Sequence, residues 1–108
     1  MTQNNKTQII QRLTKTLLDI QLLRLIGQEP TWGYKIKKTF ETELGIKLRH
    51  GALYPTLNSL EQSGFVVSQK QTQAGRARKT YTLTLKGKEY LEAYYAVLRD
   101  QLKPMSPT

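Results

Sequence analysis

The spacing of the apolar residues changes at Gly64, and this change is what most limits the fold. Before Gly64 the leucines and isoleucines recur every three or four residues, as they do along one face of an α-helix. After it, residues 65–71 and 77–83 are β-compatible, and Tyr81 and Leu83 alternate with threonines. The helical spacing returns in residues 84–103. The chain is therefore expected to be mainly α-helical with one small β-hairpin.

Glycine and proline divide the first helical part into segments. The apolar residues predict one helix over residues 6–27, which Pro30 ends. Thr31 is the expected N-cap of a second helix that stops at Gly45. A short extended piece, residues 46–48, should then connect to the next helix.

A third helix is predicted from about residue 50 to residue 63, with three leucines facing inward: Leu53, Leu57 and Leu60. Residues 72–76, which contain a glycine, should connect the two strands of the hairpin. Thr84 is the expected cap of the last helix, and Pro104 ends it.

Two helices joined by a tight turn and followed by a hairpin describe a winged helix-turn-helix. We expect residues 1–108 to form a single domain, because 38% hydrophobic residues suffice for one core. Residues 28–83 would form the winged helix-turn-helix. Residues 6–27 and 84–103 would flank it, and residues 104–108 would form a tail.

The charge balance points to a polyanionic partner. Seventeen Lys and Arg against eight Asp and Glu leave a formal net charge of +9, which favours nucleic acid or an anionic membrane surface. The absence of cysteine excludes zinc fingers and cysteine nucleophiles, and a single histidine, His50, leaves no metal cluster. No glycine-rich phosphate loop or acid pair stands out. We expect no metal, no cofactor and no enzymatic activity.

No stretch of the sequence approaches the roughly 18 uninterrupted apolar residues of a membrane span. The start of the chain lacks the pattern of a signal peptide. The lack of cysteine is consistent with a reducing compartment. We therefore expect a soluble cytoplasmic protein with no membrane partner.

The outer face of the third predicted helix carries no charge and little bulk. With the leucines inward, this face consists of Gly51, Ala52, Pro55, Asn58, Ser59 and Gln62. A slim polar helix enters a major groove about 12 Å wide, where Asn, Gln and Ser read base edges. An ordinary solvated face fits the pattern equally well. Arg49 and His50 stand at the end that such a helix directs at the bases. Tyr54 lies on the flank, where it reaches a phosphate or packs against the hairpin.

The hairpin is the stronger signal, because residues 65–88 include six basic residues and no acidic one. A charge run alone is usually a solvated surface. After a helix-turn-helix, however, basic residues around a glycine-bearing tip favour a wing that contacts phosphates. Lysines of the second helix add a weaker signal. The residues expected to contact DNA are Lys35, Lys38, Arg49, His50, Gly51, Tyr54, Pro55, Asn58, Ser59, Gln62, Arg76, Arg78 and Lys79.

Three motifs occur in order along the chain. Residues 33–36 read Gly-Tyr-Lys-Ile, residues 51–64 read Gly-Ala-Leu-Tyr-Pro-Thr-Leu-Asn-Ser-Leu-Glu-Gln-Ser-Gly, and residues 79–87 read Lys-Thr-Tyr-Thr-Leu-Thr-Leu-Lys-Gly. Together they resemble the PadR-type winged-helix transcriptional regulators, over about residues 22–102. The resemblance implies a homodimer whose first and last helices interlock on a palindromic operator, usually as a repressor. It also admits a small hydrophobic effector.

The first and last helices carry more apolar residues than one core consumes, which also predicts a homodimer. The expected dimer residues are Ile10, Leu13, Leu17, Leu91, Tyr94, Tyr95, Leu98 and Leu102.

Two alternatives stay open. A winged-helix module can serve protein or RNA interaction without operator-specific DNA binding. Trp32 is expected in the core, although with Tyr34 it could instead line an effector site.

Overall fold

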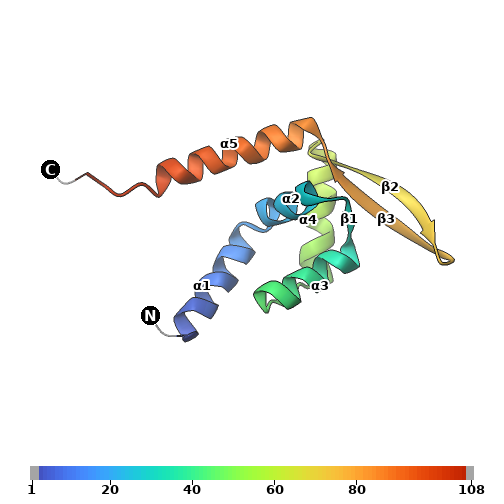
Figure 1. The fold of residues 1–108 in the computed structure, drawn as a ribbon, viewed down its shortest axis with the longest axis horizontal. Helices are drawn as coiled ribbons and strands as arrows, with labels where there is room; N and C mark the ends of the chain where they lie inside the picture. The colour runs from blue at the N-terminus through green and yellow to red at the C-terminus, as the bar shows by residue number, and fades with distance from the viewer. Residues whose placement is uncertain (1–2, 107–108) are drawn as a thin grey trace.

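The computed structural model describes residues 3–106, and within them it is mainly α-helical with a hairpin, as the sequence predicts (Figure 1). Residues 107–108 of the predicted tail lie outside the described residues. The elements in chain order are α1 (Gln3–Thr16), α2 (Leu18–Gln28), β1 (Thr31–Trp32), α3 (Gly33–Leu44), α4 (His50–Gln62), β2 (Val66–Gln73), β3 (Arg76–Leu83) and α5 (Leu85–Gln101). No helix among these residues is long and apolar enough to cross a membrane.

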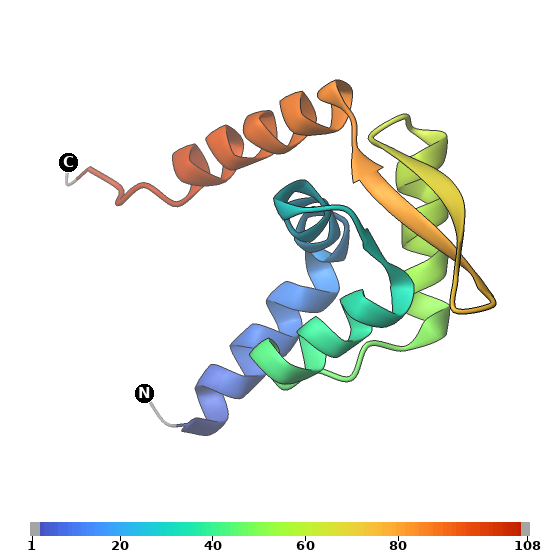
Figure 2. The same cartoon turned by 45° about the vertical axis from the view of Figure 1, so that its right-hand side comes forward.

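The single helix expected over residues 6–27 is wrong in its middle, because the chain bends at Leu17 into α1 and α2 (Figure 2). The Leu17 backbone has φ −107° and ψ 31°, outside the helical range. The Asp19 carboxylate accepts a hydrogen bond from the Ile20 N–H at 2.8 Å, a local bond that competes with the helical ladder. The bend places α2 at the centre of the fold, in contact with α1, α4, α5 and β3.

The predicted N-cap role of Thr31 is also wrong. Thr31 is buried in the short strand β1, which pairs with β3 so that Thr31 lies opposite Tyr81. Trp32 takes the N-cap position of α3 without a side-chain cap bond. A cap contributes about 1 kcal/mol, and strand pairing together with burial outweighs it here.

The core is built from the inner faces of α2, α3 and α4 against the sheet. The predicted inward leucines of α4 are all buried. The buried apolar residues are Ile20, Leu22, Leu23, Ile26, Ile36, Phe40, Leu53, Leu57, Leu60, Val66 and Tyr81. Trp32 is not among them, which corrects the expectation of a core tryptophan. It is half-buried, in the edge strand.

The hairpin connection is shorter than expected. β2 and β3 pair until Gln73 lies opposite Arg76, so the turn consists of Ala74 and Gly75 instead of residues 72–76. Both turn residues have positive φ, 52° and 77°, as a type I′ turn requires. This turn follows the strand twist, and the energy of pairing the strands to their ends exceeds the strain of an alanine in the left-handed region.

The base of the hairpin is tied to both neighbouring helices through Thr84. The predicted cap is confirmed, because the Thr84 hydroxyl accepts a hydrogen bond from the Gly87 N–H at 3.0 Å. The same hydroxyl donates to the Gly64 carbonyl at 2.7 Å, and the Thr84 N–H donates to the Phe65 carbonyl at 3.1 Å. We call these four residues, Gly64, Phe65, Thr84 and Gly87, the junction. It joins the end of α4, both strands and the start of α5.

Gly87 has no room for a side chain. A Cβ built there would collide with the Phe65 carbonyl oxygen and lie 2.8 Å from Leu83 Cδ1. Gly87→Ala should therefore lower the free energy of unfolding by about 1–3 kcal/mol, the usual cost of overpacking. Thermal unfolding followed by circular dichroism, at one fixed protein concentration, measures the change.

Gly51→Ala is the matched control, because no atom lies within 4 Å of a Cβ at Gly51 in α4. It should stabilise the fold by up to about 1 kcal/mol through helix propensity. A Gly87→Ala variant at least as stable as the parent chain would contradict the close packing of the junction.

Candidate nucleic-acid interface

The outer face of α4 is exposed to solvent. Its predicted residues are all exposed: Gly51, Ala52, Pro55, Asn58, Ser59 and Gln62. No charged side chain lies among them, while Leu53, Leu57 and Leu60 hold the opposite face in the core. α4 therefore presents to solvent a narrow surface of small and hydrogen-bonding side chains.

The start of α4 is held against α3 by Tyr54. The Tyr54 hydroxyl lies over Gly33, where a Cβ would collide with it. The Tyr54 ring also contacts the His50 ring, with centroids 4.3 Å apart, and Lys37 Nζ lies 5.4 Å from the Tyr54 centroid. Tyr54 thus packs against α3 and the core, and its contact with a phosphate stays a prediction. Gly33 permits the close packing against α3.

The predicted cations of the wing divide between the two faces of the hairpin. Arg76 and Arg78 share a face with Trp32, while Lys79 points to the face that carries Tyr81. Arg78 stacks on the indole of Trp32, with its guanidinium carbon 4.0 Å from the ring centroid. This cation–π contact holds one charge of the wing in place.

Lys35 contacts the same indole ring as Arg78 but is paired with Glu29. Its Nζ lies 2.7 Å from the Glu29 carboxylate and 5.2 Å from the Trp32 ring centroid. That ion pair holds the pKa of Glu29 below its ordinary value, first through the hydrogen bond from Lys35. Part of the charge expected for phosphate contacts is therefore already paired.

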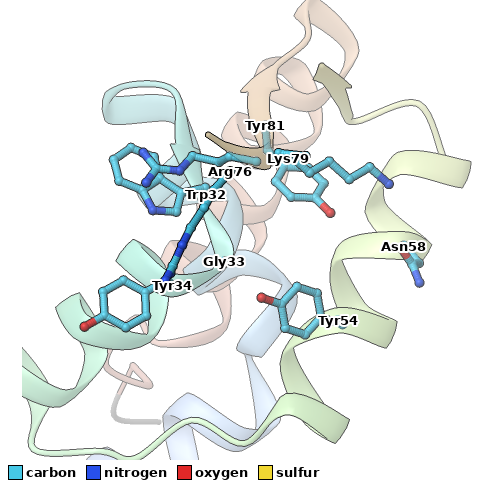
Figure 3. A pocket seen from close by; sticks show the side chains of 10 residues that line it. Trp32, Gly33, Tyr34, Tyr54, Asn58, Arg76, Lys79 and Tyr81 are labelled. Carbon is cyan, nitrogen blue, oxygen red and sulfur yellow. The ribbon is translucent and has the colours of Figure 1, made fainter. Parts of the chain in front are cut away.

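An open hollow of about 700 Å³ lies between the hairpin and the two helices of the helix-turn-helix (Figure 3). Its lining combines rings with polar and basic groups, and six of these residues are Trp32, Tyr34, Tyr54, Asn58, Arg76 and Lys79. Figure 3 shows these side chains arranged around the hollow, from α3, α4 and the sheet. The Asn58 amide and the cations of Arg76, Arg78 and Lys79 suit contacts with the sugar–phosphate backbone of a nucleic acid.

A second hollow, of about 600 Å³, lies at the turn between α3 and α4. It is basic, and its lining includes Tyr34, Lys37, Lys38, Lys47, Arg49 and His50. Lys47 is absent from the sequence prediction because it lies in the turn, outside both the helix pattern and the wing. The two hollows share Tyr34 and therefore adjoin. The second places basic residues at the start of α4, and the first places basic residues of the hairpin beside Asn58, so cations lie next to the uncharged face at the turn and at the wing.

Sequence reasoning also missed Glu61, the only acidic residue in the range 44–88. The Ser68 hydroxyl donates a hydrogen bond to Glu61 Oε2, and Lys79 Nζ lies 3.3 Å from Glu61 Oε1. The Ser68 hydrogen bond is the main reason that the pKa of Glu61 lies below its ordinary value of 4.5, and Lys79 adds to the effect. Its isolation in a basic stretch is the sequence signal that would have singled it out.

Trp32 is the only tryptophan, so its fluorescence reports on the wing. Arg78→Ala should expose the indole, shift its emission to longer wavelength and raise its quenching constant with acrylamide. Lys70→Ala removes the same charge from the opposite face of the hairpin and is the matched control. Equal quenching in the parent and in Arg78→Ala would contradict the stacking.

The family model for the PadR-like transcriptional regulators matches residues 22–93. This chain belongs to that family. The expected resemblance and the winged-helix fold are thus confirmed. The PadR-like region covers the whole helix-turn-helix, the hairpin and the first half of α5.

Two curated relatives match parts of the chain. One is the negative transcriptional regulator PadR of Bacillus subtilis, 33% identical over 91 residues, which are 82% of this chain and 49% of the relative. The other is a transcriptional regulator of Mycobacterium tuberculosis, 43% identical over 47 residues and covering 44% of each chain. The chain spans about half the length of the curated relatives that it matches.

Solved structures of PadR-like proteins have the same fold. Bacillus subtilis PadR in complex with operator DNA is similar with a TM-score of 0.70 and 29% identity, over 85% of this chain and 50% of that one. A PadR family regulator from Clostridium difficile gives a TM-score of 0.70 and 27% identity, over 77% and 88% of the two chains. A PadR-like transcription factor from Bacteroides fragilis, 24% identical, gives 0.74 over 87% and 91%, which shows the fold alone.

Proposed function

We propose that this chain is a cytoplasmic transcriptional repressor that binds a palindromic DNA operator as a homodimer. The observation that carries the proposal is the uncharged outer face of α4 with basic residues next to it at the turn and at the wing. The proposal assigns the chain no catalytic step and no cofactor.

A DNA partner would account for an uncharged helix face that has cations beside it. In specific complexes, cations hold the phosphates and fix the orientation of the protein, while uncharged amides and hydroxyls read base edges. Asn58, Ser59 and Gln62 are the base-reading candidates on α4. Arg76 and Arg78 of the wing, with Lys38 and Arg49 beside the turn, are the phosphate candidates, whereas the predicted cation Lys79 is paired with Glu61. The net charge of +9 supports the same partner.

The names of relatives support this reading. The Bacillus subtilis relative is named a negative regulator, and its structure was solved with operator DNA. Repression by this chain would follow if its operator overlaps a promoter.

The shape of the chain supports a dimer. Its radius of gyration is 15.9 Å, whereas a compact domain of this length has about 13 Å. The second half of α5 projects from the body (Figure 1). Val97 is 60% exposed and Leu102 is 77% exposed on that segment, and Leu13 of α1 is 50% exposed. A second copy would bury these groups at about 25 cal/mol per Å² of apolar surface.

The eight residues expected at the dimer interface differ in how exposed they are in the single chain. Leu17, Leu91, Tyr94 and Tyr95 pack partly against the chain's own core. Ile10 and Leu98 are half-buried, whereas Leu13 and Leu102 are exposed. We propose that the exposed residues, together with Val97, form the centre of the interface. A two-fold axis there would set the two copies of α4 one DNA turn apart, about 34 Å.

Binding to an operator, obtained by selection from random duplex DNA, should depend steeply on salt concentration. If the dimer makes six to ten phosphate contacts, affinity falls by about 10³- to 10⁵-fold between 50 and 200 mM salt. Fluorescence anisotropy with duplex and single-stranded DNA of the same sequence measures this. A flat salt response, or equal binding to duplex, single strand and RNA, favours the alternative of a protein- or RNA-interaction module.

Substitutions on the wing and on α4 should change DNA binding in different ways. Arg76→Ala should weaken binding to every duplex and lower the salt slope by about one for each phosphate that the wing no longer neutralises, hence by about two in a dimer. Asn58→Ala and Gln62→Ala should relax sequence preference, each by about 1–3 kcal/mol at its base pair. Lys103→Ala, which removes an exposed cation after α5, is the control. A uniform loss of affinity from both groups would refute the assignment of α4.

Val97→Asp should convert the dimer to a monomer, because it places a carboxylate in the proposed interface. Val97 is already exposed in the single chain, so the substitution should leave the fold intact. Ala96→Asp adds the same charge about 100° away on the helix and is the control. Sedimentation velocity measures both. A monomeric parent chain at micromolar concentration contradicts the dimer.

A further inference from the structure

Glu61 lies on α4, between the uncharged face proposed to read DNA and the hairpin. A free carboxylate in that place would repel phosphates. Its two oxygens are instead occupied by the two strands of the hairpin: Oε2 by the Ser68 hydroxyl of β2 and Oε1 by Lys79 of β3, at 3.3 Å. A single side chain of the helix thus grips both strands of the wing.

The register of the hairpin explains why the Glu61 carboxylate is needed beside Lys79. Lys79 lies directly opposite Lys70, and Ser68 lies opposite Tyr81, so all four side chains share one face. Two like charges directly opposite each other destabilise a strand pair. The Glu61 carboxylate offsets this repulsion at Lys79, and it ties the hairpin to α4 at a second point beyond the junction.

We propose that Glu61 is a positioning residue that fixes the angle between the wing and α4 and so determines the sequence specificity of DNA binding. The inference rests on the proposed function, because it names the residue that sets the geometry of the same surface.

Glu61 should affect the position of the wing more than the stability of the fold. The side chain of Glu61 is 32% exposed and that of Lys79 is 45% exposed, and ion pairs of such exposure contribute little to stability. Glu61 affects the position of the wing because the hairpin is long. The eight-residue strands reach about 27 Å from the junction, so a 10° rotation moves the wing tip by about 5 Å.

A displacement of that size should affect sequence-specific binding and random-sequence binding differently. Specific binding requires α4 in the groove and the wing on its phosphates at the same time. Binding to random sequence requires only cations near phosphates. Loosening the wing should therefore weaken specific binding and spare random binding.

Glu61→Gln tests this, because it keeps the shape and removes the charge. If the carboxylate acts only by repelling DNA, its loss should tighten specific and random binding alike, by about 3- to 10-fold in a dimer. If it positions the wing, only random binding should tighten. The ratio of specific to random affinity should then fall about 10-fold, the discrimination of roughly one base pair. Release of Lys79 should also raise the salt slope of random binding by about two in a dimer.

Ser68→Ala keeps the charge and removes only the hydrogen bond. It should lower the same ratio, by less, without tightening random binding. Glu43→Gln removes an exposed carboxylate from the end of α3 and should leave the ratio unchanged. Anisotropy titrations of all variants against the selected operator and a random duplex give the ratios, and thermal unfolding verifies the fold.

The outcomes are distinct. An unchanged ratio in both Glu61→Gln and Ser68→Ala would overturn the inference, and so would equal reductions in Glu61→Gln and Glu43→Gln. If Glu61→Gln fails to fold, Ser68→Ala decides alone. A parent chain that shows no sequence preference would overturn the proposed function instead.

Discussion

The hydroxyl of Thr84 donates to the Gly64 carbonyl that follows α4 and accepts from the Gly87 N–H in the first turn of α5. The Thr84 N–H bonds to Phe65 at the start of the hairpin. One residue therefore sets where α4 ends, where the wing begins and in which direction α5 leaves. Lys86 strengthens this point by donating to the Ser63 carbonyl at 2.8 Å.

Packing extends the junction into the rest of the molecule. The Phe65 ring stacks on Tyr90 of α5, with centroids 4.2 Å apart, and α2 fills the space between α5 and α4. The bend at Leu17 is part of this solution, because it lets α2 bury Leu22, Leu23 and Ile26 at the centre. The exposed surface includes an uncharged face on α4, cations around it and apolar groups on α5. We propose that the fold thus separates a DNA-reading surface from a dimer surface on one small core.

The sequence predicts those parts of the fold that depend on local interactions. The inward row of α4 and the cap at Thr84 follow from spacing and from one hydroxyl, and both are present. The errors arise where distant residues decide. Thr31 reads as an N-cap locally but pairs with Tyr81, fifty residues later.

The candidate site shows the same limit. Exposure of the α4 face follows from periodicity, yet the partners of individual cations do not. Arg78 is held by Trp32, and Lys79 is held by Glu61, through contacts between elements far apart in sequence. The Ala74–Gly75 turn was missed because an alanine rarely adopts positive φ and gives no local signal.

The central claim is that two copies of α4 read DNA together. Selection of binding sites from random duplex DNA tests it most directly. The account predicts an enriched sequence with two inverted half-sites whose centres lie about 10 base pairs apart, one helical turn. A selection that yields no common sequence, or a single half-site without its inverted copy, would contradict it.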